Sequence, residues 1–158
     1  MPGLEDLYRE IILDHYRSPR NRGELPAPPA TRVEGFNPLC GDEIVVFVEV
    51  ADGAVSDIRI GGQGCSISQS SASMMSAAVK GRTLDEVQAL TRSFKAMMSI
   101  HEQSLDGEGE VVIEADPDVK LGDLEALRGV VKFPVRIKCA TLSWNTLLQA
   151  IEESAASR

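Results

Sequence analysis

Three cysteines and one aspartate are the side chains of this sequence whose types could bind a metal ion together. They are Cys40, Cys65, Cys139 and Asp42. Three sulfurs and one oxygen suit a tetrahedral zinc ion best, and they also suit an iron–sulfur cluster that cysteine ligates incompletely. The spacing of the cysteines lacks the paired C-x-x-C of a zinc ribbon, so by itself it is weak evidence for a metal site. The alternative to a metal site is three buried thiols that pack as small hydrophobic groups. We predict that the fold gathers the four groups around one metal.

The predicted elements place each of these groups where the chain turns or where a helix begins. Residues i and i+2 of an extended chain point to the same side, so Cys40 and Asp42 can face one ion. Cys65 directly precedes a predicted helix and Cys139 lies near the start of another, and a helix N-terminus favours the thiolate form that binds metals. An oxygen ligand in place of a fourth sulfur indicates an exchangeable site. Cys40, on a turn beside Gly41, is the best candidate to leave it.

Hydrophobic periodicity predicts helices and strands in two groups. Apolar residues at three- and four-residue spacing predict five helices, at 4–17, 66–79, 83–101, 121–128 and 134–153. The third of these opens with a capping box at residue 83. Alternating apolar residues predict antiparallel strands at 32–36, 42–50 and 54–60, and the last two are joined by an Asp-Gly turn. The fold class is therefore α+β, a small three-stranded antiparallel sheet with helices packed mainly on one face.

The connecting segments differ in composition. The proline-rich stretch 20–31 is expected to run extended over the surface without packing deeply. The acidic stretch 106–118 is expected to be a loop with a short extended piece at 111–113. Gly81 is expected to cap the helix before it and Gly129 to stop the short helix. The Cys139 position lies away from the apolar stripe of the last helix, on the side of Arg136, so the core does not explain that cysteine.

Composition excludes several classes of function. The chain of 158 residues is expected to form one domain and carries 16 basic and 24 acidic residues, a net charge of -8 that opposes nucleic-acid binding. It has no apolar run of membrane-spanning length and no signal-peptide pattern at its start. In a reducing compartment three cysteines, an odd number, indicate metal ligands, reactive thiols or buried small hydrophobic residues before they indicate a disulfide framework. We therefore expect a cytoplasmic protein with neither nucleic-acid nor membrane partners.

Five sequence segments resemble one known family. They are 7–11, 14–23, 37–42, 64–71 and 134–139. On these segments the chain is similar, over nearly its whole length, to the IscU/SufU/NifU N-terminal family of iron–sulfur cluster assembly proteins. The resemblance implies that Cys40, Cys65 and Cys139 are the three functional cysteines of the family and that Asp42 is its aspartate.

Three departures from the scaffold members indicate the SufU branch. Lys138 stands before the third cysteine, where scaffold members carry histidine. The segment 132–136 reads Lys-Phe-Pro-Val-Arg, where scaffold members carry the Leu-Pro-Pro-Val-Lys that an Hsp70-type chaperone reads. The stretch between the second and third cysteines is longer by a helix and its loop. We therefore expect a single SufU/IscU-like domain at 1–158 with a helical insert at about 82–130.

For the SufU branch the resemblance implies a zinc ion held by the three cysteines and Asp42. It implies a sulfur carrier rather than a stand-alone enzyme. Its sulfur donor would be a SufS-like, PLP-dependent cysteine desulfurase, with downstream iron–sulfur assembly proteins as later partners. In the implied mechanism a desulfurase histidine replaces Cys40 on zinc, and Cys40 accepts the persulfide sulfur. Arg136 resembles the arginine that lies near the metal in this branch, and it is expected to pair with Asp42 when either group is displaced.

Two other functions fit the same residues. A scaffold would transiently hold a [2Fe-2S] cluster on Cys40, Cys65 and Cys139, and a zinc-stabilised binding module would use no thiol chemistry. His15 and His101 are expected to be structural or partner-facing residues, since neither is beside a cysteine. A glycine cluster at 61–64 lacks the lysine and the spacing of a phosphate-binding P-loop.

Overall fold

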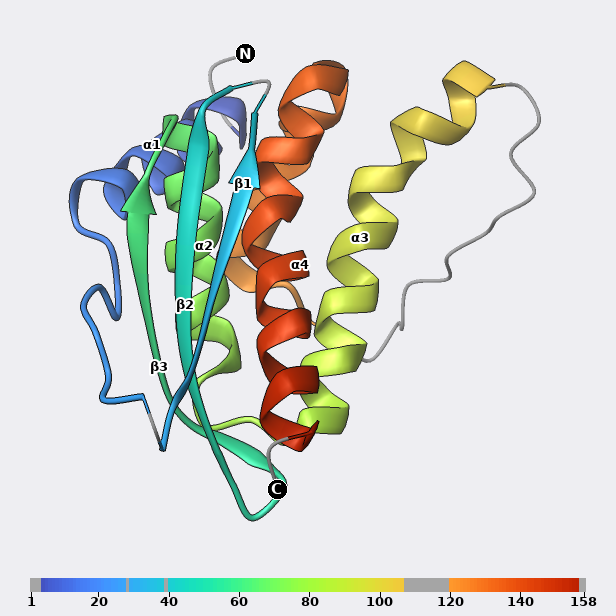
Figure 1. The fold of residues 1–158 in the computed structure, drawn as a ribbon. Helices are drawn as coiled ribbons and strands as arrows, with labels where there is room; N and C mark the ends of the chain where they lie inside the picture. The colour runs from blue at the N-terminus through green and yellow to red at the C-terminus, as the bar shows by residue number, and fades with distance from the viewer. Residues whose placement is uncertain (1–3, 28, 39, 107–119, 157–158) are drawn as a thin grey trace.

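A three-stranded antiparallel sheet forms one layer of the protein, as the computed structural model shows (Figure 1). The model describes residues 4–27, 29–38, 40–106 and 120–156, and for 4–7, 99–106 and 156 it describes the backbone alone. The strands lie in the order β1 (Thr31–Asn37), β2 (Asp42–Ala51) and β3 (Ala54–Gln63). The Asp-Gly hairpin turn is confirmed, because Asp52 and Gly53 both have positive φ angles, 54° and 75°.

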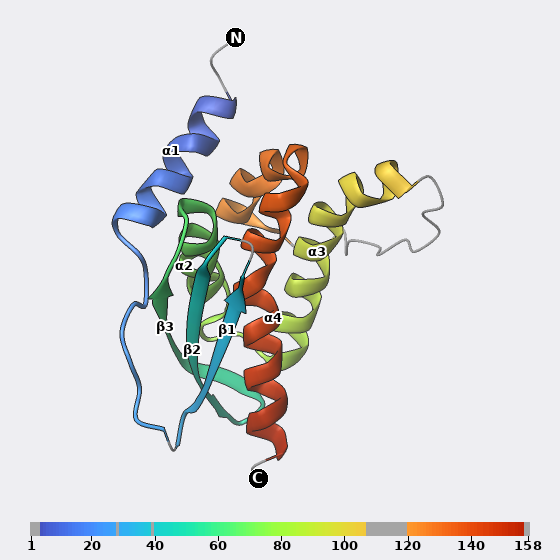
Figure 2. The same ribbon diagram turned by 45° about the horizontal axis from the view of Figure 1, so that its top comes forward.

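Helices cover one face of this sheet, so the predicted fold class is confirmed (Figures 1 and 2). They are α1 (Leu4–Arg17), α2 (Ser66–Val79), α3 (Leu84–Asp106), the 3-10 helix η1 (Gly122–Lys132) and α4 (Pro134–Ala156). α2 lies against β3, and α4 lies against β1 and β2. α3 stands at the far side of α4 from the sheet. Within the described residues, no helix is both long and apolar enough to span a bilayer.

The hydrophobic core lies between the sheet and the helices. Alternation along β2 buries Ile44, Val46 and Val48 on the face toward the helices. Farther from the sheet, Trp144 of α4 stacks on Phe94 of α3 with ring centroids 4.8 Å apart. This core fixes the register of β2 and the position of α4, the two elements that carry the potential metal ligands Asp42 and Cys139.

The proline-rich segment packs more closely than its composition predicts. The Gly23 N–H donates to the Ile60 carbonyl at 3.0 Å, and the Ile60 N–H donates to the Asn21 carbonyl at 2.9 Å. The segment thus covers the free edge of β3 by a short parallel pairing at Arg22. These residues stay at the surface, as predicted, since Arg22, Gly23 and Glu24 are exposed. Their pairing with the strand edge, where Asn21 turns the chain with a positive φ of 56°, was not predicted.

Two other boundaries differ from the predictions. η1 continues past Gly129 to Lys132, because Gly129 does not adopt the positive φ that would stop it, whereas Gly81 does adopt one, 82°, after α2. β3 runs three residues beyond the predicted end, to Gln63. The predicted extended piece at 111–113 and the side chain of His101 lie outside the described residues.

His15 joins three elements and is a structural residue. Its side chain is buried on α1, where Nδ1 lies 2.8 Å from Ser73 Oγ of α2 and Nε2 lies 3.0 Å from Asp123 Oδ2 of η1. The Ser73 hydroxyl also accepts from the Arg20 N–H at 2.8 Å. Every polar atom of the imidazole therefore has a partner, as a buried polar group requires.

A substitution at Gly35 should test the packing of α4 on the sheet. An added Cβ would collide with Thr146 Oγ1 and would lie 3.3 Å from Leu142 Cδ1 of the same helix. Since overpacking costs roughly 1–3 kcal/mol, we expect Gly35→Ala to lower the free energy of unfolding in urea by that amount. Gly129→Ala is the matched control, because an added Cβ there meets nothing within 4 Å. Equal stability of the two variants would contradict the packing.

Candidate metal centre

Three of the four predicted ligand side chains meet at one end of the sheet. Cys40 lies in the turn between β1 and β2, Asp42 begins β2, and Cys139 lies in the second turn of α4. One potential ligand atom from each of the three lies within 4.8 Å of the others, and the Cys139 and Cys40 sulfurs are 3.3 Å apart. Residues 99 positions apart in the sequence are thus brought together, as the four-residue hypothesis requires.

Asp42 is buried and oriented by three hydrogen bonds, which come from the end of β1 and from the start of α2. Its Oδ1 accepts from the Cys65 N–H at 2.9 Å and from Ser68 Oγ at 3.1 Å, and its Oδ2 accepts from Asn37 Nδ2 at 3.3 Å. Burial alone would raise the pKa of this carboxyl. The hydrogen bonds, first that of the Cys65 N–H, outweigh burial and hold the pKa below its ordinary value of 3.8. Asp42 therefore offers a fixed, negatively charged oxygen.

Cys65 is adjacent to this group of three but is not part of it. Its sulfur caps α2 by accepting the Ser68 N–H at 3.4 Å, and its own N–H holds Asp42. The thiol lies close enough to Cys139 to raise the pKa of that residue and close enough to Arg136 to raise the pKa of the guanidinium. The structure thus confirms the position of Cys65 ahead of a helix and places its thiol beside the site.

Cys139 is fully buried, although it lies off the apolar stripe of α4. Burial, and then the hydrogen bonds with Asp42 and Cys40, raise the pKa of its thiol well above the ordinary value of 9.0. These effects outweigh the thiolate-favouring influence that the sequence predicted from the nearby helix start. The thiol also accepts from Asn37 Nδ2 at 3.5 Å. A cation placed here would reverse the balance, since a metal deprotonates the thiol that binds it.

Arg136 lies at the edge of the centre with an exposed side chain. Its pKa is raised chiefly by the charge of Cys65 and by a hydrogen bond with that residue, and then by Cys139. The predicted pairing of Arg136 with Asp42 stays a prediction. Lys138, which stands where scaffold members carry histidine, is exposed, as expected for a solvated charge.

Gly64 is a residue of the site that the sequence prediction did not identify. A Cβ on Gly64 would lie 2.5 Å from Asp42 Oδ1 and 2.7 Å from Ser68 Oγ. Only glycine therefore allows the chain to pass close enough for the next N–H, that of Cys65, to reach the carboxylate. Asn37 and Ser68 were also missed as orienting groups. The available sequence signal for these two residues was a polar side chain close to a predicted ligand. Such side chains are common in turns and at helix starts, so this signal does not single them out.

The donor set fits a zinc ion. Two sulfurs bound to tetrahedral zinc at about 2.3 Å lie about 3.8 Å apart, close to the 3.3 Å between Cys40 and Cys139. The carboxylate is already oriented by its hydrogen bonds, as expected when outer groups position a metal ligand. The same sulfurs also suit an iron–sulfur cluster.

Comparison with known proteins places this geometry in context. The family model of the NifU-like N terminal domain matches residues 7–140. The chain is 43% identical over 148 residues to the zinc-dependent sulfurtransferase SufU of Bacillus subtilis, and the match covers 94% of this chain and 91% of that protein. It is 39% identical over 152 residues to the iron-sulfur cluster assembly scaffold protein IscU of Streptococcus pyogenes, with 96% and 87% covered.

Solved structures include the same fold. The crystal structure of a protein ascribed a scaffold role in iron-sulfur cluster assembly by the SUF system, from Fervidobacterium islandicum, superposes with a TM-score of 0.76 at 29% identity. The superposition covers 94% of this chain and 99% of that one. The sheet and the helices thus form one shared architecture.

Proposed function

The chain belongs to the family of the NifU-like N-terminal domain, and from this premise we propose that it serves iron–sulfur cluster assembly as a zinc-dependent sulfur acceptor. One observation carries the proposal: Cys40, Asp42 and Cys139 converge within 4.8 Å, and Cys40 is the cysteine of this group that remains partly exposed. The similarity to a zinc-dependent sulfurtransferase supports zinc as the metal. Cys40, Asp42, Cys65 and Cys139 would hold it.

The four groups would divide into anchors and a carrier. Asp42 and Cys139 are buried and bound to their surroundings by hydrogen bonds, so they are suited to stay in place. Cys40 lies next to Gly41, which has a φ of 67° and open space around it, so this corner can move without disturbing the core. Zinc, when bound, would keep the coordinating thiols deprotonated at neutral pH.

The sulfur donor would be a PLP-dependent cysteine desulfurase of the SufS type. The Cys40 thiolate attacks the terminal sulfur of a persulfide on the desulfurase cysteine. A new sulfur–sulfur bond forms on Cys40, the bond within the donor persulfide breaks, and the donor cysteine leaves as a thiolate. Arg136 supports this step with a positive charge beside the thiols. The sulfur then passes to downstream assembly proteins, so the chain acts as a carrier in the cytoplasm.

The domain organisation belongs to the same proposal. The chain forms one domain over 1–158, and the region at about 82–130, which contains α3 and most of η1, is an insert characteristic of the sulfur-acceptor branch. A second function, a scaffold that transiently holds [2Fe-2S] as cargo, is supported by the similarity to IscU proteins and by the sulfur donors of the same centre.

Metal analysis separates the two functions. We expect untagged protein, purified without added metal, to contain one zinc per chain by inductively coupled plasma mass spectrometry, because the donor set matches tetrahedral zinc. Iron with acid-labile sulfide in equal amounts would instead favour the scaffold. With zinc retained, failure to transfer a cluster to an apo-protein after anaerobic reconstitution would reject the scaffold. Protein without either metal would contradict both.

A further inference from the structure

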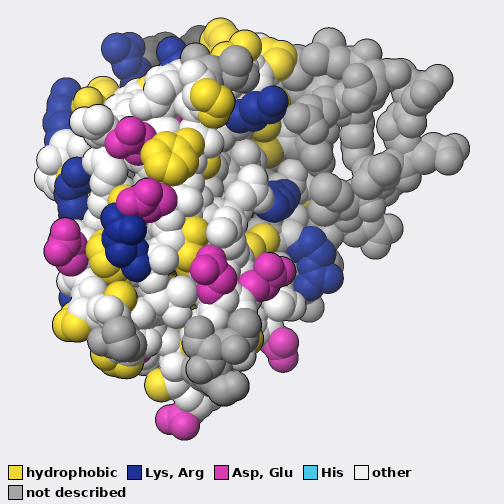
Figure 3. All heavy atoms as spheres, in the orientation of Figure 1, with side chains coloured by type: hydrophobic (Ala, Val, Ile, Leu, Met, Phe, Trp, Pro, Cys, Tyr) yellow, Lys and Arg dark blue, Asp and Glu magenta, His cyan; other side chains and the backbone are white. Residues whose placement is uncertain are grey.

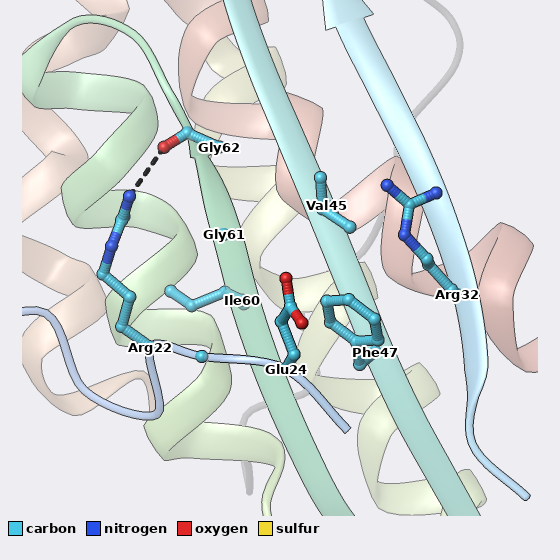
Figure 4. A pocket seen from close by; sticks show the side chains of 9 residues that line it. Arg22, Glu24, Arg32, Val45, Phe47, Ile60, Gly61 and Gly62 are labelled. Carbon is cyan, nitrogen blue, oxygen red and sulfur yellow. Dashed lines mark hydrogen bonds between the residues drawn. The ribbon is translucent and has the colours of Figure 1, made fainter. Parts of the chain in front are cut away.

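A hollow of about 290 Å³ lies on the face of the sheet opposite the helices (Figure 4). The segment 22–24 bounds it on one side and Arg32 of β1 on the other. The side chains of Val45 and Phe47, on β2, form its apolar floor. None of the four candidate metal ligands lines it. Its function is therefore separate from that of the metal centre.

The hollow exists because β3 carries no side chain at Gly61. This residue lies opposite Val45 in the strand register, and an added Cβ would meet only the Val45 Cβ, at 4.0 Å. The next residue differs, because Gly62 has a φ of 110° and an added Cβ there would collide with the Glu43 backbone. The backbone requires glycine at position 62 but not at position 61. The bare surface at Gly61 is therefore unexplained by packing, and it leaves Val45 partly exposed beside the buried Phe47.

Two arginine side chains line the rim of the hollow, and each has N–H donors that its present contacts do not use. Arg22 donates to the Gly62 carbonyl at 2.8 Å and to Gln69 Oε1 at 3.3 Å, which fixes the direction of its side chain. Arg32 pairs with Glu34 and lies 5.8 Å from the centroid of the Phe47 ring. A guanidinium has five N–H donors, and these contacts use only some of them. Arg32 can therefore also bind a carboxylate, whereas the guanidinium of Arg22 is directed toward the Gly62 carbonyl and α2.

One carboxylate lies between the two arginines. Glu24 is exposed, and it has no hydrogen-bond or ion-pair partner among the residues that the structure describes. Figure 4 shows its carboxylate above the middle of the hollow, between the sides that Arg22 and Arg32 occupy. The surrounding face carries acidic and basic side chains interspersed (Figure 3). The hollow thus presents both signs of charge around an apolar floor.

We propose that this hollow binds a free α-amino acid with a branched apolar side chain. The ammonium group of the ligand would bind Glu24, its carboxylate Arg32, and its side chain the floor of Val45 and Phe47. The volume lies just below the roughly 300–1,000 Å³ of ligand sites, which suits a ligand as small as an amino acid. An anion alone would leave Glu24 without a partner, and a cation alone would leave the spare donors of Arg32 unused.

Titration of the ¹⁵N-labelled full chain with valine tests the proposal. We expect the backbone amide signals of Gly61 and Gly62 to shift and to saturate with a Kd on the order of 1 mM. Isovalerate is valine without the ammonium group, and isobutylamine is valine without the carboxylate, so each should bind about tenfold more weakly, since a charged hydrogen bond is lost. Equal shifts with all three compounds, or no shift with valine, would overturn the proposal.

Three variants locate the site. Gly61→Leu should fill the hollow and abolish the valine-induced shifts, and Glu24→Gln should weaken binding about tenfold while it preserves the shape of the side chain. Asp52→Asn removes a carboxylate on the β2–β3 turn, outside the hollow, and should bind valine normally. Unchanged binding by either of the first two variants would refute the assignment. If Gly61→Leu does not fold, the Glu24→Gln variant alone still tests the proposed site.

Discussion

Cys40→Ala is expected to accept no sulfur from a cysteine desulfurase while it keeps the fold. The lost thiol is the proposed attacking group, and no other cysteine of the centre combines partial exposure with a place on a turn. The core should be unaffected, because Cys40 is not among the buried core residues. After incubation with desulfurase and L-cysteine, alkylation and peptide mass mapping should find persulfide on the wild-type residue and only background on the variant.

The outcome tests the sulfur-acceptor function against the zinc-stabilised binding module. Persulfide at normal yield on the variant would show that Cys40 is not the acceptor. If all three thiols of the wild type were equally inert with desulfurase present, the zinc-stabilised binding module would be favoured. Cys40→Ser is the matched variant, since it preserves the size of the side chain but supplies a far weaker nucleophile. It should fail to the same extent as alanine, and equal thermal unfolding of the three proteins would exclude misfolding.

The sequence was sufficient to predict the ligand types and their elements but not the groups that orient them. Cys40 and Asp42 were identified because their spacing is local, and the burial of alternate residues on β2 follows directly from its pattern. Asn37, by contrast, orients Asp42 and also contacts Cys139, 102 residues away. Such a contact depends on the docking of α4 against the sheet, which no local pattern contains.

The same distinction explains the burial of Cys139 and the edge pairing of β3. The helical wheel correctly placed Cys139 off the main apolar stripe, yet the residue is buried, because α4 has a second covered face at the candidate centre. The segment around Arg22 carries no strand pattern, and its pairing with Ile60 arises from the free hydrogen-bonding groups on the edge of β3. Both features follow from tertiary packing.

Gly64→Ala is expected to remove metal from the protein without changing any ligand. The added Cβ would lie 2.5 Å from Asp42 Oδ1 and 2.7 Å from Ser68 Oγ, so either the carboxylate must leave its position or the chain must shift and withdraw the Cys65 N–H. Each adjustment disturbs the oxygen ligand and the cysteine after it, and loss of such orienting contacts typically costs 10–100-fold in metal affinity. Competition with a chromophoric chelator measures that loss.

Gly61→Ala is the matched control for this experiment. It lies three residues earlier, within β3, and its added Cβ would meet no atom closer than 4.0 Å, so its zinc affinity should equal that of the wild type. A Gly64→Ala protein with wild-type zinc affinity would show that Asp42 does not ligate the metal, because the collision falls on its Oδ1. If the variant loses zinc but still folds, the result would show that the Asp42 ligand depends on the close approach of the backbone at Gly64.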